Sequence, residues 1–259
     1  MFATASEIVR RRELLWILVA RNLKIRYKGS ALGFFWSLLG PLCLIVIYAV
    51  FLRLIRFSIP RPVLVTGILV WQFLATCLGD ALYAVVGNAN LVTKAAFPRI
   101  MLPMAMVAAN LVNFLLSCVV LGVYLAVAGA DWGAVYWFPA ILLTQTALCF
   151  GVSLVLSAAN VFFRDTQHIL SVVMLAWFFM TPVIYPVSLV RAQQFPSWVE
   201  TAFFANPMTG ILSAYRTVLL SAEAAPAGLM ALSFAVAWLA LAAGLWIFHR
   251  VQPAFGDEL

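Results

Sequence analysis

The sequence predicts an all-α membrane protein with six transmembrane helices in one domain, residues 1–259. Of its 259 residues, 65% are hydrophobic and 10% are charged, whereas soluble domains contain about 45–50% apolar and about 25% charged residues. This composition leaves too little polar surface to cover a water-soluble globule. The apolar runs continue for about 20 residues, enough for a helix to cross a bilayer. They lack the alternation that is typical of membrane β-barrel strands.

An amphipathic helix is predicted before the first span, over residues 7–29. At 100° per residue its apolar face carries Trp16, Val19, Leu23 and Tyr27. The opposite face carries the cations Arg21, Lys24 and Lys28, and Arg26 departs from this pattern. Such a helix lies in the membrane interface with its cations near lipid phosphates, and chemistry alone favours a topology anchor. We do not expect a cleaved signal peptide, because the basic segment before the apolar run is almost thirty residues long and the run itself is too long and bulky for a signal core.

The hydropathy pattern predicts the six spans at residues 31–52, 63–86, 101–128, 135–159, 169–185 and 226–248. An even number of spans brings both termini to one side, which then holds most of the cations and is therefore the cytoplasmic side. Asp80 is the one acid well inside a span. Such charges are functional candidates, but Asp80 lies about two helical turns from the cytoplasmic end. We therefore favour a contact with water or with a nearby cation.

Two cytoplasmic connections are longer than simple turns. In residues 87–103, Asn90 is expected to cap a short helix over residues 91–97. That helix would expose Leu91 and Val92, together with Phe97, as a docking surface. A helix end at the lipid interface is the equal alternative. The second connection, residues 160–170, contains a lone histidine without a neighbouring nucleophile, and we interpret it as a loop that contacts a partner.

The connection between the last two spans is too polar to span and too apolar to be a free loop. It contains Pro182, Pro186, Pro196 and Pro207. Asn206 and Pro207 form a favourable helix start, with asparagine as the cap and proline in the first turn. We expect two short helices that dip into the outer leaflet, within a re-entrant segment over residues 190–220.

Several motifs that define other membrane proteins are missing. The sequence has no GxxxxGK[ST] phosphate loop, no series of carboxylates for a proton relay, no internal repeat of a secondary carrier and no potassium-channel filter. The four cysteines lie in apolar runs without a CxxC pair or a histidine cluster, so no metal site is predicted. These absences favour a membrane subunit whose conformational change is driven by a separate protein.

Six sequence motifs resemble one family in their order along residues 14–255. They are "RYKGSALGFFWSLLGPL", "TGILVWQFL", "NANLVTKAAFPRIMLP", "NVFFRDTQHI", "TPVIYP" and "NPMTGILSAYR". Each is weak alone, but together they are specific. This pattern resembles the type 2 permeases of ABC transporters, in the group that exports polysaccharides and polyol phosphates.

The resemblance implies six spans per chain in a homodimer, with a transport path between the copies, in the bacterial inner (plasma) membrane. It implies two separate ABC ATPase subunits that bind ATP and Mg, no cofactor or enzymatic activity in this chain, and no nucleic-acid partner. The cargo would be a lipid-linked polysaccharide such as O-antigen, capsule or a teichoic-acid-like polymer. The interface helix would use Arg21, Lys24, Arg26 and Lys28. A coupling helix over residues 90–97 would contact the ATPase through Leu91, Val92, Thr93 and Lys94.

Aromatic residues are candidates for the transport path, because sugars stack on aromatic faces. The candidates are Phe34, Phe35, Trp36, Trp177, Phe178 and Phe179. Each is alternatively an ordinary lipid-facing residue. The nearest rival function is the export of a drug or a small lipid by the same fold. A membrane-embedded glycosyl or acyl transferase would need clustered His, Asp or Glu residues, which here are scattered, and an ion channel would conduct alone.

Overall fold

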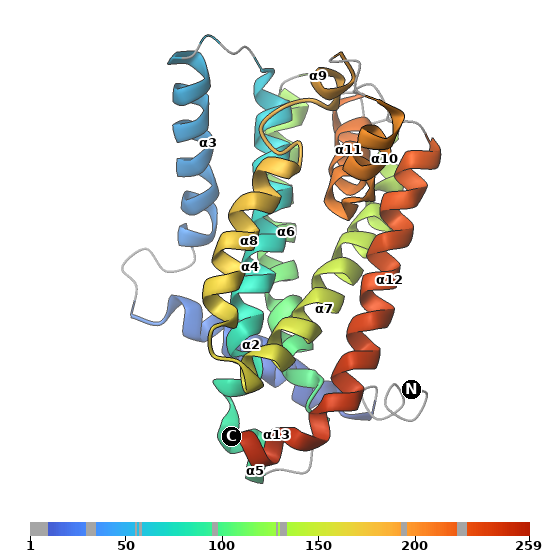
Figure 1. Cartoon of the computed structure of the whole chain (residues 1–259). Helices are drawn as coiled ribbons and strands as arrows, with labels where there is room; N and C mark the ends of the chain where they lie inside the picture. Colours follow the sequence, from blue (N-terminus) through green and yellow to red (C-terminus); the bar gives the residue numbers. More distant parts are fainter. Residues whose placement is uncertain are drawn as a thin grey trace.

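The computed structural model describes residues 10–29, 35–54, 56, 59–94, 98–127, 129, 134–192, 196–221 and 227–259. In these ranges all regular secondary structure is helical, as predicted. Four helices run along the bundle and are long and apolar enough to cross a membrane (Figure 1): α4 (Arg61–Val86), α6 (Met101–Val127), α7 (Phe138–Phe162) and α12 (Ala227–Val251). Two shorter apolar helices lie beside them, α3 (Trp36–Leu54) and α8 (Thr166–Met180).

The second and third predicted spans agree with α4 and α6 to within two residues. The fifth span, predicted over residues 169–185, is shorter, because α8 ends at Met180. Thr181, which precedes Pro182, has an extended conformation with ψ 140°, and a residue before proline is disfavoured in the helical region. The first span begins in residues outside the described ranges, and its described part is α3.

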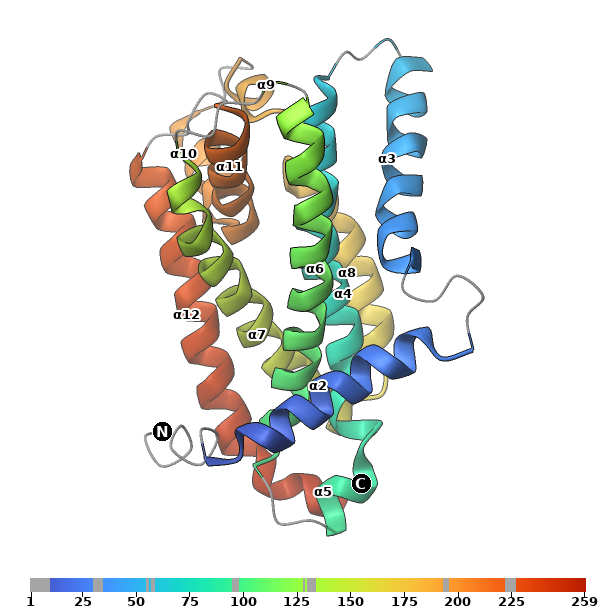
Figure 2. The ribbon, with the colours of Figure 1, turned by 180° about the vertical axis from the view of Figure 1, so that it is seen from behind.

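Short helices gather at the two ends of the bundle (Figures 1 and 2). One end holds α5 (Ala89–Lys94), α13 (Phe255–Glu258) and α2 (Arg12–Tyr27), which runs across the side of the bundle formed by α6. The other end holds α9 (Val187–Ala192), α10 (Ser197–Ala205) and α11 (Pro207–Leu220). The prediction of two short helices there was therefore wrong, since the segment forms three. Most of α11 is buried within the bundle, whereas in α10 only Phe204 is buried.

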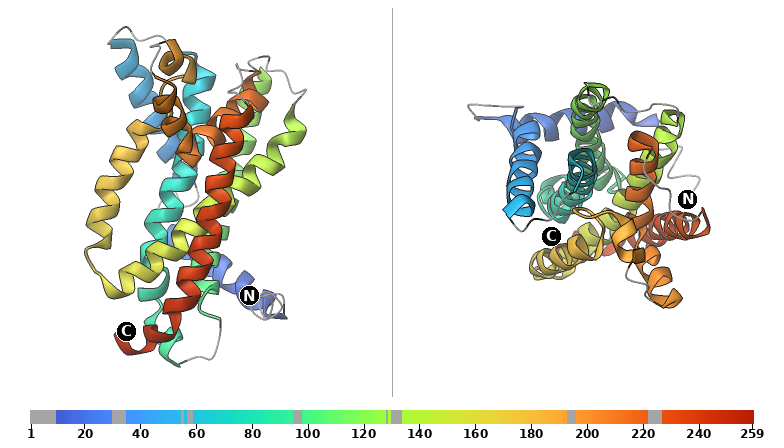
Figure 3. Two further views of the ribbon diagram at one scale, coloured as in Figure 1. Left: turned by 45° about the vertical axis from the view of Figure 1, so that its right-hand side comes forward. Right: turned by 90° about the horizontal axis from the view of Figure 1, so that it is seen from above.

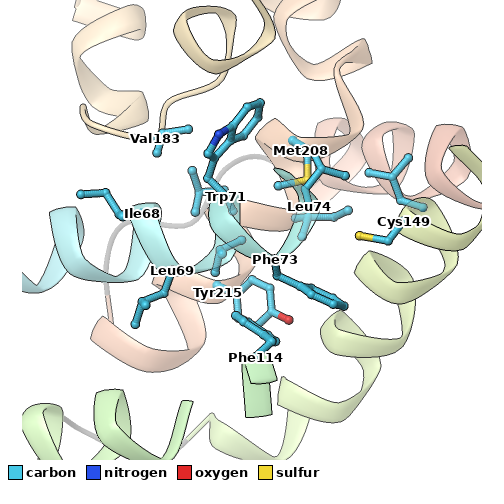
Figure 4. Packing of buried hydrophobic residues seen from close by; sticks show 14 of the residues in the cluster. Ile68, Leu69, Trp71, Phe73, Leu74, Phe114, Cys149, Val183, Met208 and Tyr215 are labelled. Atoms are coloured by element: carbon cyan, nitrogen blue, oxygen red, sulfur yellow. The ribbon is translucent and has the colours of Figure 1, made fainter. Parts of the chain in front are cut away.

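Helix α4 is the centre of the core, and it packs against α3, α6, α7, α8 and α11. Figure 4 shows its buried side chains meeting residues of α6 and α11. Phe73 of α4 stacks on Phe114 of α6 with ring centroids 4.8 Å apart, and Phe114 meets Tyr215 of α11 edge-on. This aromatic contact joins three helices whose residues are distant in the sequence.

Helices α7 and α12 cross closely through paired glycines (Figure 3). A Cβ atom on Gly244 would lie 2.2 Å from the carbonyl oxygen of Gly151. Small residues let helix backbones approach in a membrane, where packing rather than water exclusion drives association. The crossing therefore requires glycine at both positions.

Arg216 of α11 joins α11 to the start of α4 and to the turn that follows α8. The residue is 4% exposed, and its guanidinium donates to the carbonyls of Tyr185 at 2.9 Å, Val183 at 2.8 Å and Val63 at 3.2 Å. Gly67 makes room for this contact, since a Cβ atom there would lie 2.0 Å from the Val183 oxygen. The arginine thus supplies hydrogen-bond donors to three backbone carbonyls, one in α4 and two in the turn after α8.

The predicted helix start at Asn206 is confirmed. Its side chain accepts a hydrogen bond from the Met208 backbone N–H at 3.1 Å, and Pro207 is the first residue of α11. The same Oδ1 atom accepts from the indole N–H of Trp177 at 2.8 Å. One asparagine therefore caps α11 and holds the end of α8.

Candidate functional site

A polar cluster joins α2 to the lower halves of α4 and α6. Arg26 of α2 forms an ion pair with Asp80 of α4 and donates to Asn110 Oδ1 of α6 at 2.8 Å. The Asn110 amide donates in turn to Asp80 Oδ2 at 2.7 Å. We call Arg26, Asp80 and Asn110 the base triad. It confirms that Asp80 reaches a nearby cation, and it explains why Arg26 departs from the amphipathic pattern of α2.

A second contact joins α2 to the start of α5. Arg21 donates to Asn88 Oδ1 at 2.7 Å, and the Asn88 amide donates to the Ala84 carbonyl of α4 at 2.8 Å. The Asn88 carbonyl accepts from the N–H groups of Leu91 and Val92. Asn88 thus precedes the helix, and the predicted cap at Asn90 was wrong because α5 begins one residue before it.

The predicted apolar face of α2 does not pack against the bundle as one unit, since Trp16 is 66% exposed. Leu18 and Val19 are buried instead, against α6 and neighbouring helices. The helix is turned in this way because Arg21 and Arg26 both bond to groups of the bundle, while Lys24 is exposed. Lys28, just beyond the helix, is also exposed.

A cavity of about 420 Å³ lies between α2, α4 and α6 beside the base triad. Its lining residues are Arg21, Asn22, Leu23, Ile25, Arg26, Asp80, Tyr83, Gly87, Asn88, Met106 and Ala109. The Tyr83 hydroxyl donates to Gln167 of α8 at 2.6 Å. Arg21 and Arg26, the two residues that attach α2 to the bundle, therefore both border this cavity.

The predicted docking surface on α5 is only partly exposed. Val92 is 3% exposed and packs in a cluster with Phe255 of α13, so its predicted exposure was wrong. Leu91 is half-buried and Thr93 is exposed. Lys94 ends the helix, and Phe97 lies outside the described residues.

The last residues of the chain cover α5, which accounts for the burial of Val92. Helix α13 contacts α5, and the Arg99 guanidinium, just beyond α5, donates to the Gln252 carbonyl. Thr93 therefore lies on the outer face of α5. The opposite face, which carries Val92, packs against α13.

The described candidate path aromatics are one buried residue, one half-buried residue and three exposed ones. Phe178 is 8% exposed, and its ring meets Tyr48 of α3 and Trp71 of α4 with centroids 5.7 Å and 5.4 Å apart. Trp177 is half-buried and bonded to Asn206. Residues of the exposed group are Phe35, Trp36 and Phe179. Phe34 lies outside the described residues.

Asn110 and Asn88 take part in these contacts but were not singled out from the sequence. Asn110 lies in the middle of an apolar span, and a polar side chain there commonly bonds to a neighbouring helix. That rule would have drawn attention to Asn110. Nothing in the local sequence distinguishes Asn88, whose role depends on the position of Arg21.

Residues 13–220 of the chain match a family of known proteins, the ABC-2 type transporters. The chain is 35% identical over 267 residues to the O-antigen export system permease protein RfbA of Myxococcus xanthus, covering 100% of each chain. Two proteins of the same name from Klebsiella pneumoniae are 31% and 28% identical, each over 95% of both chains.

Proposed function

The chain belongs to the ABC-2 type transporter family, and from that premise we propose that it is the membrane permease of an ATP-driven exporter of lipid-linked polysaccharide. The observation that carries this proposal is the full-length similarity to permeases named for O-antigen export. The cargo is an O-antigen, capsular or teichoic-acid-like polymer that leaves the cytoplasm. No similarity favours the alternative of a drug or small lipid. ATP and Mg bind to separate ATPase subunits.

In this proposal α3 and α8 complete a set of six spans, and two copies of the chain enclose the path. Both helices carry rows of exposed apolar side chains, which rest in lipid or against the second copy. Those of α3 are Trp36, Leu42, Val46, Ile47, Val50, Phe51 and Leu54, and those of α8 are Ile169, Val172, Val173, Leu175, Phe179 and Met180. The ends of α2 and α13 lie in the cytoplasm, because the basic N-terminal segment is at that end of the bundle.

The contacts of α5 support its role in coupling to the ATPase. Asn88, directly before α5, is bonded to both α4 and Arg21 of α2. The base triad then joins α2 to α4 and α6. A displacement of α5 by the ATPase therefore moves α2 and the lower ends of two spans together.

Deletion of the gene tests the proposed function. We expect lipid-linked polymer to accumulate in the cytoplasm and to return to the surface when the intact gene is restored. The purified chain should hydrolyse no ATP, whereas the co-purified complex should. Undiminished surface polymer in the deletion strain, or ATP hydrolysis by the isolated chain, would contradict the proposal.

Charge introduced on the exposed face of α5 should uncouple the ATPase without unfolding the permease. Asn90→Glu combined with Thr93→Glu changes two exposed side chains, so we expect normal membrane insertion and about a tenfold or greater loss of export. Val92 is unsuitable for this test, because a charge at a buried site would destabilise the fold. His249→Glu, an exposed position in the last turn of α12, is the control. Equal export by both variants would remove the coupling role.

A further inference from the structure

An apolar crevice opens between α3, α4 and α6, at a distance from the base triad. Its volume is about 350 Å³, and its lining residues are Leu42, Ile45, Ala49, Arg61, Leu64, Val65, Leu69, Ser117, Val120, Leu121 and Tyr124. Apart from Arg61, the Tyr124 hydroxyl and Ser117, this lining is hydrocarbon. The Ser117 hydroxyl already donates to the Asn113 carbonyl at 3.0 Å, so its proton is not available to a ligand in the crevice.

A positive charge stands where this crevice meets the end of the bundle that holds α9, α10 and α11. Arg61 is exposed and is the first residue of α4, where the helix dipole adds positive potential. The sequence has no acidic residue between Glu13 and Asp80. Among the described residues, Arg61 forms no ion pair with an acidic side chain. Its guanidinium is thus available to an anion from outside the chain.

We propose that the crevice binds an anionic glycerophospholipid, with one acyl chain against α3, α4 and α6 and the phosphate on Arg61. The acyl chain of the lipid matches the apolar lining of the crevice, and its phosphate matches Arg61. The hydrocarbon chain supplies the dispersion contacts that an empty crevice would lose, and a guanidinium pairs with phosphate oxygens through two parallel hydrogen bonds. A soluble anion would fill only the mouth, and a zwitterionic lipid such as phosphatidylcholine would bring a second positive charge beside Arg61.

The bound lipid would steady α3 against the bundle. Helix α3 packs chiefly on α4 and to a lesser extent on α6, and many of its other side chains are exposed. An acyl chain between α3 and its two neighbours extends this limited packing. The inference does not depend on the identity of the cargo, because it concerns a lipid that stays with the protein.

Lipid retention by the full-length chain, purified with its ATPase partner in mild detergent, tests the proposal. After incubation with phosphatidylglycerol or phosphatidylcholine, native mass spectrometry counts the lipids that remain bound. We expect the wild type to retain phosphatidylglycerol selectively. Arg61→Gln should weaken that retention about tenfold, as expected for the loss of a charge-assisted hydrogen bond.

A second variant tests the crevice rather than the charge. Val120→Phe, which adds volume to the lining, should also lower retention, whereas Val119→Phe, at the adjacent exposed position outside the lining, should not. Arg53→Gln is the matched control for Arg61→Gln, since it is an exposed arginine at the end of α3. Equal binding of the two lipids, or unchanged retention by Arg61→Gln, overturns the proposal. Crosslinking of position 65 between two copies does so too, because a second chain would then occupy the crevice.

Discussion

Arg216→Met should lower the unfolding free energy of the protein by about 3–6 kcal/mol, the largest loss that we expect from a single side chain. The carbonyls of Val63, Val183 and Tyr185 would each lose their guanidinium donor, and a buried unsatisfied group costs about 1–3 kcal/mol. Methionine fills similar space but offers no N–H group. Thermal unfolding of the purified protein in detergent measures the change.

Two further variants separate the hydrogen bonds of Arg216 from its charge and bulk. Arg216→Lys keeps a charge but lacks the planar array of donors, so we expect an intermediate midpoint of unfolding. Arg250→Met removes an exposed arginine at the opposite end of the bundle, and we expect little change. If Arg216→Met unfolds at the same temperature as Arg250→Met, the three carbonyl contacts do not hold α11 in place.

Breaking the base triad should reduce export about tenfold while the bundle remains folded. Asp80→Ala leaves Arg26 and Asn110 without their shared acceptor, and contacts of this kind contribute about 1–3 kcal/mol when one partner is charged. Because both charged side chains are 33% exposed, water screens the pair and limits the loss of stability. The expected effect is therefore on the attachment of α2, measured as polymer exported per ATP hydrolysed.

A double-mutant cycle isolates this contact. Arg26→Gln should cause a loss similar to that of Asp80→Ala, and the double variant should lose no more than either single one. The exchange of the two charges, Arg26→Asp with Asp80→Arg, should restore part of the activity. Lys24→Gln is the control, as an exposed cation on the same helix. Strictly additive losses would mean that Arg26 and Asp80 act separately.

Several features of the fold follow from local sequence. The bounds of α4 and α6 were predicted to within two residues, because about twenty apolar residues in a row have one stable arrangement in lipid, a helix that satisfies its own backbone. The start of α11 was predicted because an asparagine cap and a proline at the first position act within one helical turn. The nearby cation for Asp80 was also expected, although its identity was not.

The tertiary structure alone decided which residues meet. Asp80 and Arg26 are separated by 54 positions, and Arg216 and Val63 by 153, so no periodicity relates them. Val92 had the local pattern of an exposed helix, but α13 covers it. Phe178 and Phe179 are alike in sequence, yet packing against α3 and α4 buries only the first. Local sequence sets helix formation and membrane insertion through short-range energies, whereas partners and burial depend on how distant helices pack.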